Sequence, residues 1–171
     1  ELVQGPGAPL RPRSTTTSST TPPPIPKAPE PPPVITVQGG ALRTWTYRSP
    51  SVEQVQVVLT TEGRPLDAEC ELWAGPGNVP VKMRVFVEDG QLRPFSCVLA
   101  TPRGEKTVAI RNVGQLEFPF NAQCIAEDVD HPSEDCYAAA KTLQGGATTS
   151  VHFDPSVDSV QVLLQSDGMP L

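Results

Sequence analysis

Four cysteines and one acidic stretch hold the side chains of this 171-residue chain that are best suited to chemistry. Two thiols could form a disulfide, and thiolates gathered with imidazole or carboxylate groups could bind a metal ion. The chain has no Cys-x-x-Cys pair, so the cysteine spacing resembles no zinc site. Cys70, Cys97 and Cys124 fall on the apolar positions of alternating segments, which favours free thiols buried in a core. A Cys97–Cys124 or Cys70–Cys97 disulfide is the alternative.

The acidic stretch at residues 126–136, AEDVDHPSEDC, concentrates carboxylates around one histidine and one cysteine. It lacks the alternating ligands and the central glycine of a calcium-binding loop. We therefore expect a solvated linker and no metal site, although its negative charge could contact a basic partner. The possible ligands in this stretch are Glu127, Asp128, Asp130, His131, Glu134, Asp135 and Cys136.

Catalytic motifs are missing from the sequence, which contains no nucleophile elbow, phosphate-binding loop or metal-binding helix motif. Both histidines, His131 and His152, lie outside the segment that could fold into a complete module, which excludes a histidine-dependent hydrolase on that module. Catalysis by carboxylates such as Glu69, Glu71 or Glu88 is the weakest option, because alternation places them on a polar face. We expect no enzyme, no catalytic residue and no cofactor of its own.

An internal repeat gives the strongest information on architecture. Residues 49–66, SPSVEQVQVVLTTEGRPL, return at residues 154–171 as DPSVDSVQVLLQSDGMPL, with ten of eighteen positions identical. Each copy follows a Gly-Gly pair, at 39–40 and at 145–146. The offset of 105 residues suits one small domain and is too long for a solenoid unit. We expect one complete module followed by the first strands of a second, truncated repeat at residues 145–171.

Residues 38–125 alternate apolar and polar side chains with a period of two, as half-buried strands do. The clearest segment is VKMRVFV at residues 81–87, and turns such as AGPGNVP and EDGQ separate such segments. Seven or eight short strands at this spacing predict an all-β fold, an antiparallel β-sandwich or jelly roll. Pro94 and Pro119 fall within apparent strands, which predicts that those strands are edges or bulged.

Two segments flank this module. Residues 126–144 read as the acidic linker, in which a serine cap and an alanine run predict one short helix over 133–143. Residues 1–37 read as an arm rich in Pro, Thr and Ser, whose PPPIPKAPEPPP tract predicts an extended polyproline II conformation. The arm is a simple tether, a strap lying in a groove of a larger assembly, or a Pro-Ser-Thr stalk of a secreted protein. The candidate strap contacts are Pro22, Pro23, Pro24, Ile25, Pro31 and Val34.

The overall charge limits the choice of partners. A net charge of −6 and a pI near 4.9 argue against nucleic acid. No apolar run is long enough for a membrane span, so we expect peripheral association at most. Cations gather in the middle of the module and could dock on an acidic protein surface. The candidate contacts there are Lys82, Arg84, Arg93 and Arg103.

The stretch over residues 71–120 resembles a repeated module of nuclear-encoded plastid proteins of red-lineage algae. The resemblance covers the complete module and, more weakly, the start of the second copy. The motifs that carry it are ELW at 71–73, GPGN at 75–78, EDG at 88–90, RPF at 93–95, TVAIRN at 107–112 and EFP at 117–119.

Similar proteins are peripheral, pigment-free subunits of photosystem I and its antennae in diatoms and dinoflagellates. The resemblance implies a structural subunit that binds the photosystem I core and light-harvesting antenna subunits at the thylakoid surface of the plastid. A stromal position agrees with reduced cysteines and is favoured, whereas a lumenal position would suit a disulfide. The alternative function is a secreted carbohydrate- or surface-binding β-sandwich on a glycosylated stalk, with Trp45, Tyr47 and Trp73 as an aromatic platform, although both tryptophans are also candidate core anchors.

Overall fold

The computed structural model of the chain describes residues 32–166. These residues all belong to one compact unit of the chain, Pro32–Leu171. The candidate strap contacts from Pro22 to Pro31 therefore lie outside the described residues.

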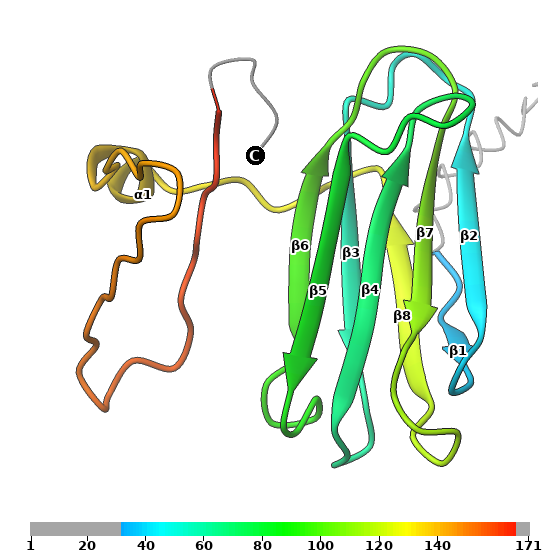
Figure 1. The fold of residues 1–171 in the computed structure, drawn as a ribbon, viewed down its shortest axis with the longest axis horizontal. Helices are drawn as coiled ribbons and strands as arrows, with labels where there is room; N and C mark the ends of the chain where they lie inside the picture. The colour runs from blue at the N-terminus through cyan, green and yellow to red at the C-terminus, as the bar shows by residue number, and fades with distance from the viewer. Residues whose placement is uncertain (1–31, 167–171) are drawn as a thin grey trace, which may run out of the picture. The chain divides into compact units, whose positions relative to one another are not determined.

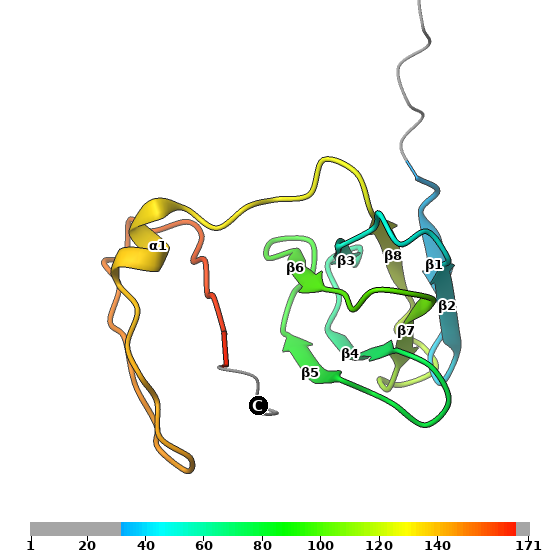
Figure 2. The same ribbon diagram turned by 90° about the horizontal axis from the view of Figure 1, so that it is seen from above.

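Two antiparallel four-stranded sheets form a β-sandwich (Figures 1 and 2). The strand orders are β1-β8-β3-β6 and β2-β7-β4-β5, which is the order of an eight-stranded jelly roll. The all-β sandwich expected from the alternating pattern is thus confirmed. The strands are β1 (Ile35–Val37), β2 (Leu42–Tyr47), β3 (Gln54–Thr60), β4 (Leu66–Trp73), β5 (Val81–Val87), β6 (Phe95–Ala100), β7 (Lys106–Asn112) and β8 (Phe120–Ile125).

The hydrophobic core lies between the two sheets and is built from every second residue of each strand. Val55, Val57 and Leu59 of β3 face β4, whose Cys70 and Leu72 are likewise completely buried. Because side chains alternate between the faces of a strand, the intervening residues point outward. This alternation creates two outer faces, one on each sheet.

The N-terminal boundary of the sandwich differs from the sequence-based one. β1 pairs with β8 through Ile35–Ala122 and Val37–Phe120, and Val37 is fully buried. The last three residues of the expected arm, 1–37, therefore belong to the sandwich. Their β-branched side chains favour a strand, which the proline tract had obscured.

The turn between β1 and β2 explains the first Gly-Gly pair. Gly40 has a φ of +76°, a conformation that suits glycine, and its N–H donates to the Asn112 carbonyl at 2.9 Å. A Cβ atom at Gly39 would lie 2.4 Å from the carbonyl oxygen of Gln115. Only a glycine at position 39 lets the turn approach the β7–β8 loop this closely.

Two prolines occupy different positions from those expected. β6 begins at Phe95 and β8 at Phe120, so Pro94 and Pro119 precede their strands instead of interrupting them. β6 is an edge strand as predicted, but β8 lies inside its sheet. A proline directly before a strand costs no ladder hydrogen bond, which removes the reason to expect an edge.

The C-terminal part of the described chain contains one short helix and no strand. Helix α1 (Glu134–Ala138) is capped by Ser133, whose Oγ accepts from the Cys136 N–H at 3.2 Å. It is shorter than the expected 133–143. Residues 145–166 form no strand in the structure, so the first strands of the second repeat are not formed there (Figure 1). Within residues 32–166, no helix has the length and apolarity to cross a membrane.

Candidate interaction surfaces

Three of the four cysteines, Cys70, Cys97 and Cys124, belong to the core or pack against it. All four are free, and Cys70 and Cys124 are buried between the sheets. Burial raises the pKa of Cys70 and of Cys124 to about 12, and that of Cys97 to about 11. Because the thiolate is the nucleophile, these thiols are unreactive near neutral pH. The expected free thiols are present, and neither alternative disulfide is formed.

The outer face of the sheet β2-β7-β4-β5 carries a ladder of paired charges. Lys82 Nζ lies 2.9 Å from Glu71 and 3.9 Å from Glu69. The Arg84 guanidinium donates to both carboxylate oxygens of Asp67, at 3.0 and 3.2 Å. The hydrogen bond from Lys82, assisted by one from Trp73, lowers the pKa of the Glu71 carboxyl. Two of the predicted contact cations are thus already paired within the sheet.

The other two predicted cations lie elsewhere. Arg93 is in the turn before β6 and Arg103 is in the turn after it, and both are exposed. The two turns lie at opposite ends of one strand, so the four predicted cations form no single patch. Docking through Arg93 or Arg103 stays a prediction.

The outer face of the sheet β1-β8-β3-β6 has a different character. The side chains on this face, identified by register with the outward residues of β3, include no charged residue. Four of them are apolar, namely Val58, Val98, Ala100 and Ile125. We call this surface the uncharged face. Its residues are Thr36, Gln54, Gln56, Val58, Thr60, Ser96, Val98, Ala100, Asn121, Gln123 and Ile125.

Glutamines on the uncharged face hold the segments that enter and leave the module. The Gln123 side chain donates to the Pro32 carbonyl at 2.7 Å, two residues before Val34, which is 62% exposed. Gln56 is only 6% exposed, and its Oε1 accepts from the Asp130 N–H at 3.1 Å. Its Nε2 also donates to the Asp130 carboxylate. The acidic linker is therefore anchored to the sandwich through β3.

The counterpart of Gln56 in the second repeat holds the same linker. Gln161 Oε1 accepts from the Ser133 N–H at 3.0 Å, and Gln161 Nε2 donates to the His131 carbonyl at 3.3 Å. Sequence reasoning missed both glutamines. One feature of the sequence could have identified them: the same glutamine stands between apolar residues in both copies of the repeat, as Gln56 and as Gln161.

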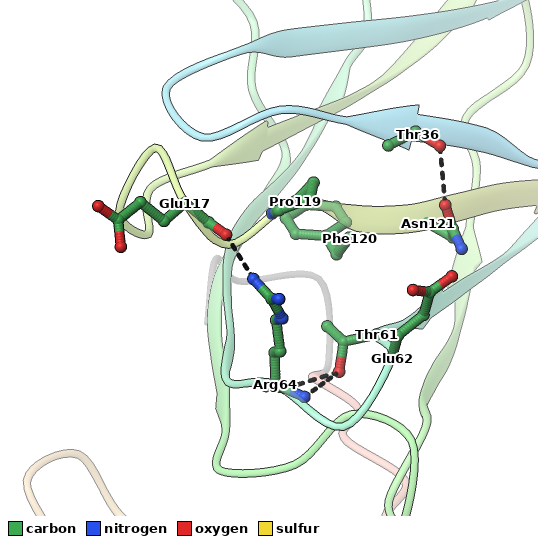
Figure 3. Close-up of a pocket in the computed structure, with 8 residues that line it drawn as sticks. All are labelled: Thr36, Thr61, Glu62, Arg64, Glu117, Pro119, Phe120 and Asn121. Carbon is green, nitrogen blue, oxygen red and sulfur yellow. Dashed lines mark hydrogen bonds between the residues drawn. The ribbon is translucent and has the colours of Figure 1, made fainter.

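A hollow of 280 Å³ lies at the end of the sandwich where the β3–β4 and β7–β8 loops meet (Figure 3). Figure 3 shows the Arg64 side chain directed at the backbone of Glu117, whose carbonyl accepts from Arg64 Nη1 at 3.0 Å, while the Glu117 carboxylate points away. Thr61 Oγ1 donates to the Arg64 carbonyl at 2.6 Å. Arg64 thus braces two loops, which leaves the hollow without a free cation for a ligand.

The aromatic platform of the alternative function is not assembled. Trp45 and Tyr47 pack against the core, and burial raises the pKa of the Tyr47 hydroxyl to about 12. Trp73 lies on the charged outer face, where its Nε1 donates to Glu71 at 2.8 Å. Trp45 is therefore a core anchor as expected, whereas Trp73 is not. In the part of the chain that the structure describes, no group of three or more His, Cys, Asp or Glu residues could hold a metal ion.

Comparison with known proteins identifies the family. A family model described as "Diatom pyrenoid shell protein" matches residues 27–171, which include the sandwich, the linker and the second repeat. A search of curated proteins found no match. The match confirms the expected plastid group of red-lineage algae, and it contains no reference to photosystem I. The chain belongs to the diatom pyrenoid shell protein family.

Proposed function

We propose that the chain is a non-catalytic structural subunit of the protein shell of the diatom pyrenoid. The observation that carries this proposal is the family match, which extends from residue 27 to residue 171. A plastid assembly role agrees with the resemblance seen in the sequence. A shell subunit needs protein contacts and no catalytic residue. We therefore include the absence of catalysis in the proposal.

The two outer faces of the sandwich suit a subunit of a thin protein layer. Two sheets packed face to face form a slab whose sheets are about 10 Å apart. The charges of one face are paired with one another, as at Arg84 and Asp67, so this face is well suited to water. The side chains of the uncharged face can contact protein without the cost of desolvating charges, except at Gln56, where the Asp130 carboxylate of the linker already lies on the face.

Docking on photosystem I and its antenna at the stromal thylakoid surface is a narrower prediction. The family description supports an assembly role in the plastid, and it does not extend to photosystem I. The strap residues and the four predicted cations remain candidate contacts, for which we propose neighbouring shell subunits as partners.

Fractionation of diatom plastids tests the proposed function. Gentle lysis followed by density separation yields pyrenoids and thylakoid membranes, and mass spectrometry then quantifies peptides from residues 38–125. We expect these peptides to be enriched with the pyrenoids, while photosystem I peptides, which serve as the control, follow the membranes. Recovery of the protein with detergent-solubilised photosystem I would contradict the proposal.

A further inference from the structure

A second hollow, of 440 Å³, lies at the end of the sandwich where the β4–β5 and β6–β7 connections meet (Figure 1). We call it the Trp73 hollow. Trp73 is the last residue of β4 and lies opposite Thr107 of β7 in the ladder. The hollow combines an indole and a proline ring with one carboxylate. Its lining residues are Trp73, Gly75, Pro76, Glu105 and Thr107.

The indole of Trp73 already has its polar group paired. Its Nε1 donates to the Glu71 carboxylate at 2.8 Å, and the same carboxylate lies 2.9 Å from Lys82 Nζ. The rest of the indole ring is apolar. A bound segment can therefore pack against this ring without leaving a polar group unpaired.

Glu105 contributes a carboxylate that is only weakly paired. It lies 3.6 Å from Arg48 Nε, and the two side chains are 65% and 84% exposed. Such exposed ion pairs contribute little to stability, because water and salt screen the charges. Glu105 is therefore able to exchange this partner for a cation of another segment.

The proline tract of the arm has the chemistry that suits such a hollow. Residues 22–31, PPPIPKAPEP, contain a proline at every third position, at Pro23, Pro26 and Pro29. In the polyproline II conformation that the sequence predicts, three residues make one turn, so these prolines share one edge. P-x-x-P segments of this kind bind to aromatic-lined grooves and lose little conformational entropy. Lys27 adds a cation within the motif.

We infer that residues 22–31 of one copy dock in the Trp73 hollow of a second copy, with prolines against the indole and Lys27 paired with Glu105. This inference rests on the proposed function and makes the arm a strap between shell subunits. Charge complementarity favours this occupant. Glu30 lies one turn beyond Lys27 and supplies a carboxylate for Arg48, so the exchange leaves no charge without a partner.

The contact joins two different surfaces and therefore propagates. An arm on one copy and a hollow on the next form a heterologous interface, which continues from copy to copy unless the rotation closes a ring. Such a contact supplies one direction of growth in an extended layer.

Nuclear magnetic resonance of the dilute, isotope-labelled 171-residue chain tests this contact with the peptide PPPIPKAPEP. Neighbouring copies dissociate on dilution, so excess peptide should fill the hollow and shift the indole N–H signal of Trp73. Trp45 packs against the core and provides the internal control. Its indole signal should stay in place.

Charge reversal tests the ion pair. Glu105→Lys should weaken peptide binding at least about fivefold, because attraction to Lys27 becomes repulsion. Glu117→Lys is the matched control, since it makes the same charge change at an exposed residue outside the hollow, and it should bind the peptide as the unchanged chain does. A peptide carrying Lys27→Glu should bind poorly to the unchanged chain and recover its affinity for the Glu105→Lys variant.

Sedimentation velocity of the full chain at a series of concentrations tests whether the tract joins two copies. The unchanged chain should associate as its concentration rises. Lys27→Glu should weaken this association by a factor similar to that seen with the peptide. Combining it with Glu105→Lys in one chain should restore association.

Several results would overturn the inference: an unshifted Trp73 signal, equal effects of Glu105→Lys and Glu117→Lys, or a charge swap that restores nothing. A hollow that stays filled at every dilution would also overturn it, because the tract would then dock within its own chain. These results would leave the shell role in place, since the plastid fractionation tests that role separately.

Discussion

Lys106 is the most unusual residue in the sandwich, because its side chain is buried without a carboxylate beside it. It is 1% exposed, and its Nζ donates to the carbonyl oxygens of Ser49, at 3.1 Å, and of Val52. A weaker contact of 3.5 Å reaches the Pro102 carbonyl. The ammonium group therefore closes the end of the sandwich, where the β2–β3 and β6–β7 connections meet.

Replacing this ammonium should destabilise the fold. Lys106→Met keeps most of the volume but removes the charge-assisted hydrogen bonds to the Ser49 and Val52 carbonyls, so we expect the free energy of unfolding to fall by about 2 kcal/mol. Urea denaturation monitored by tryptophan fluorescence measures the change. Arg103→Met is the control, because Arg103 is an exposed cation nearby in the sequence, and it should change stability by less than about 0.5 kcal/mol. Equal midpoints for the two variants would show that Lys106 has no such role.

The buried thiols predict a loss of stability at alkaline pH. Burial raises the pKa of Cys70 from 9.0 to about 12, so the unfolded chain releases this proton at a lower pH than the folded chain does. The contribution is complete below about pH 9 and is lost as pH rises toward about 12, by about 1.4 kcal/mol per pH unit for one thiol. Denaturation curves at pH values between about 8 and about 11 measure the slope. Cys70→Ala should flatten it, and an unchanged slope would contradict the burial of this thiol.

At the scale of elements, the first Gly-Gly turn fixes the position of β1 beside the β7–β8 loop. A methyl group at position 39 would overlap the backbone of Gln115 and Leu116. The same substitution at Gly145, in the second repeat, would meet nothing within 4 Å. The two glycines thus occupy equivalent places in the repeat and very different environments.

This difference gives a matched pair of variants. Gly39→Ala should lower the free energy of unfolding by about 1–3 kcal/mol, because backbone atoms must move to remove the overlap. Gly145→Ala should alter it by less than about 0.5 kcal/mol. Thermal unfolding of both variants measures the two changes in stability. Equal destabilisation would mean that the turn does not approach the loop as closely as the structure shows.

The strands of the sandwich could be predicted from the sequence because their apolar residues alternate regularly. The segments around Val57, Cys70 and Val85 were assigned to strands with their buried faces correctly chosen. β1 was missed because three residues after a proline tract are too few to show a period. Helix α1 is shorter than predicted because none of its residues is buried, and a short helix without tertiary packing is only marginally stable in water.

The interaction surfaces were less accessible to sequence reasoning. Alternation identified Lys82 and Arg84 as outward residues, but their ion pairs depend on strand register, which requires the fold. Likewise, the uncharged face combines residues of four strands that are far apart in the sequence. The burial of Lys106 could have been detected from the sequence, because Lys106 alternates with Val108 and Ile110, whose side chains point into the core.

At the scale of the whole molecule, the family match and the character of the two sandwich faces support the same account. The chain provides a slab with one face of paired charges and one uncharged face. These are features that serve assembly, and they agree with membership of the pyrenoid shell family. A subunit bound to photosystem I would instead lie at the thylakoid membrane.

The most direct test of the account is immunogold electron microscopy of diatom plastids, with an antibody raised against the sandwich of residues 38–125. The account predicts that gold particles form a line along the perimeter of the pyrenoid. Labelling spread along the thylakoid membranes, or throughout the pyrenoid interior, would contradict it.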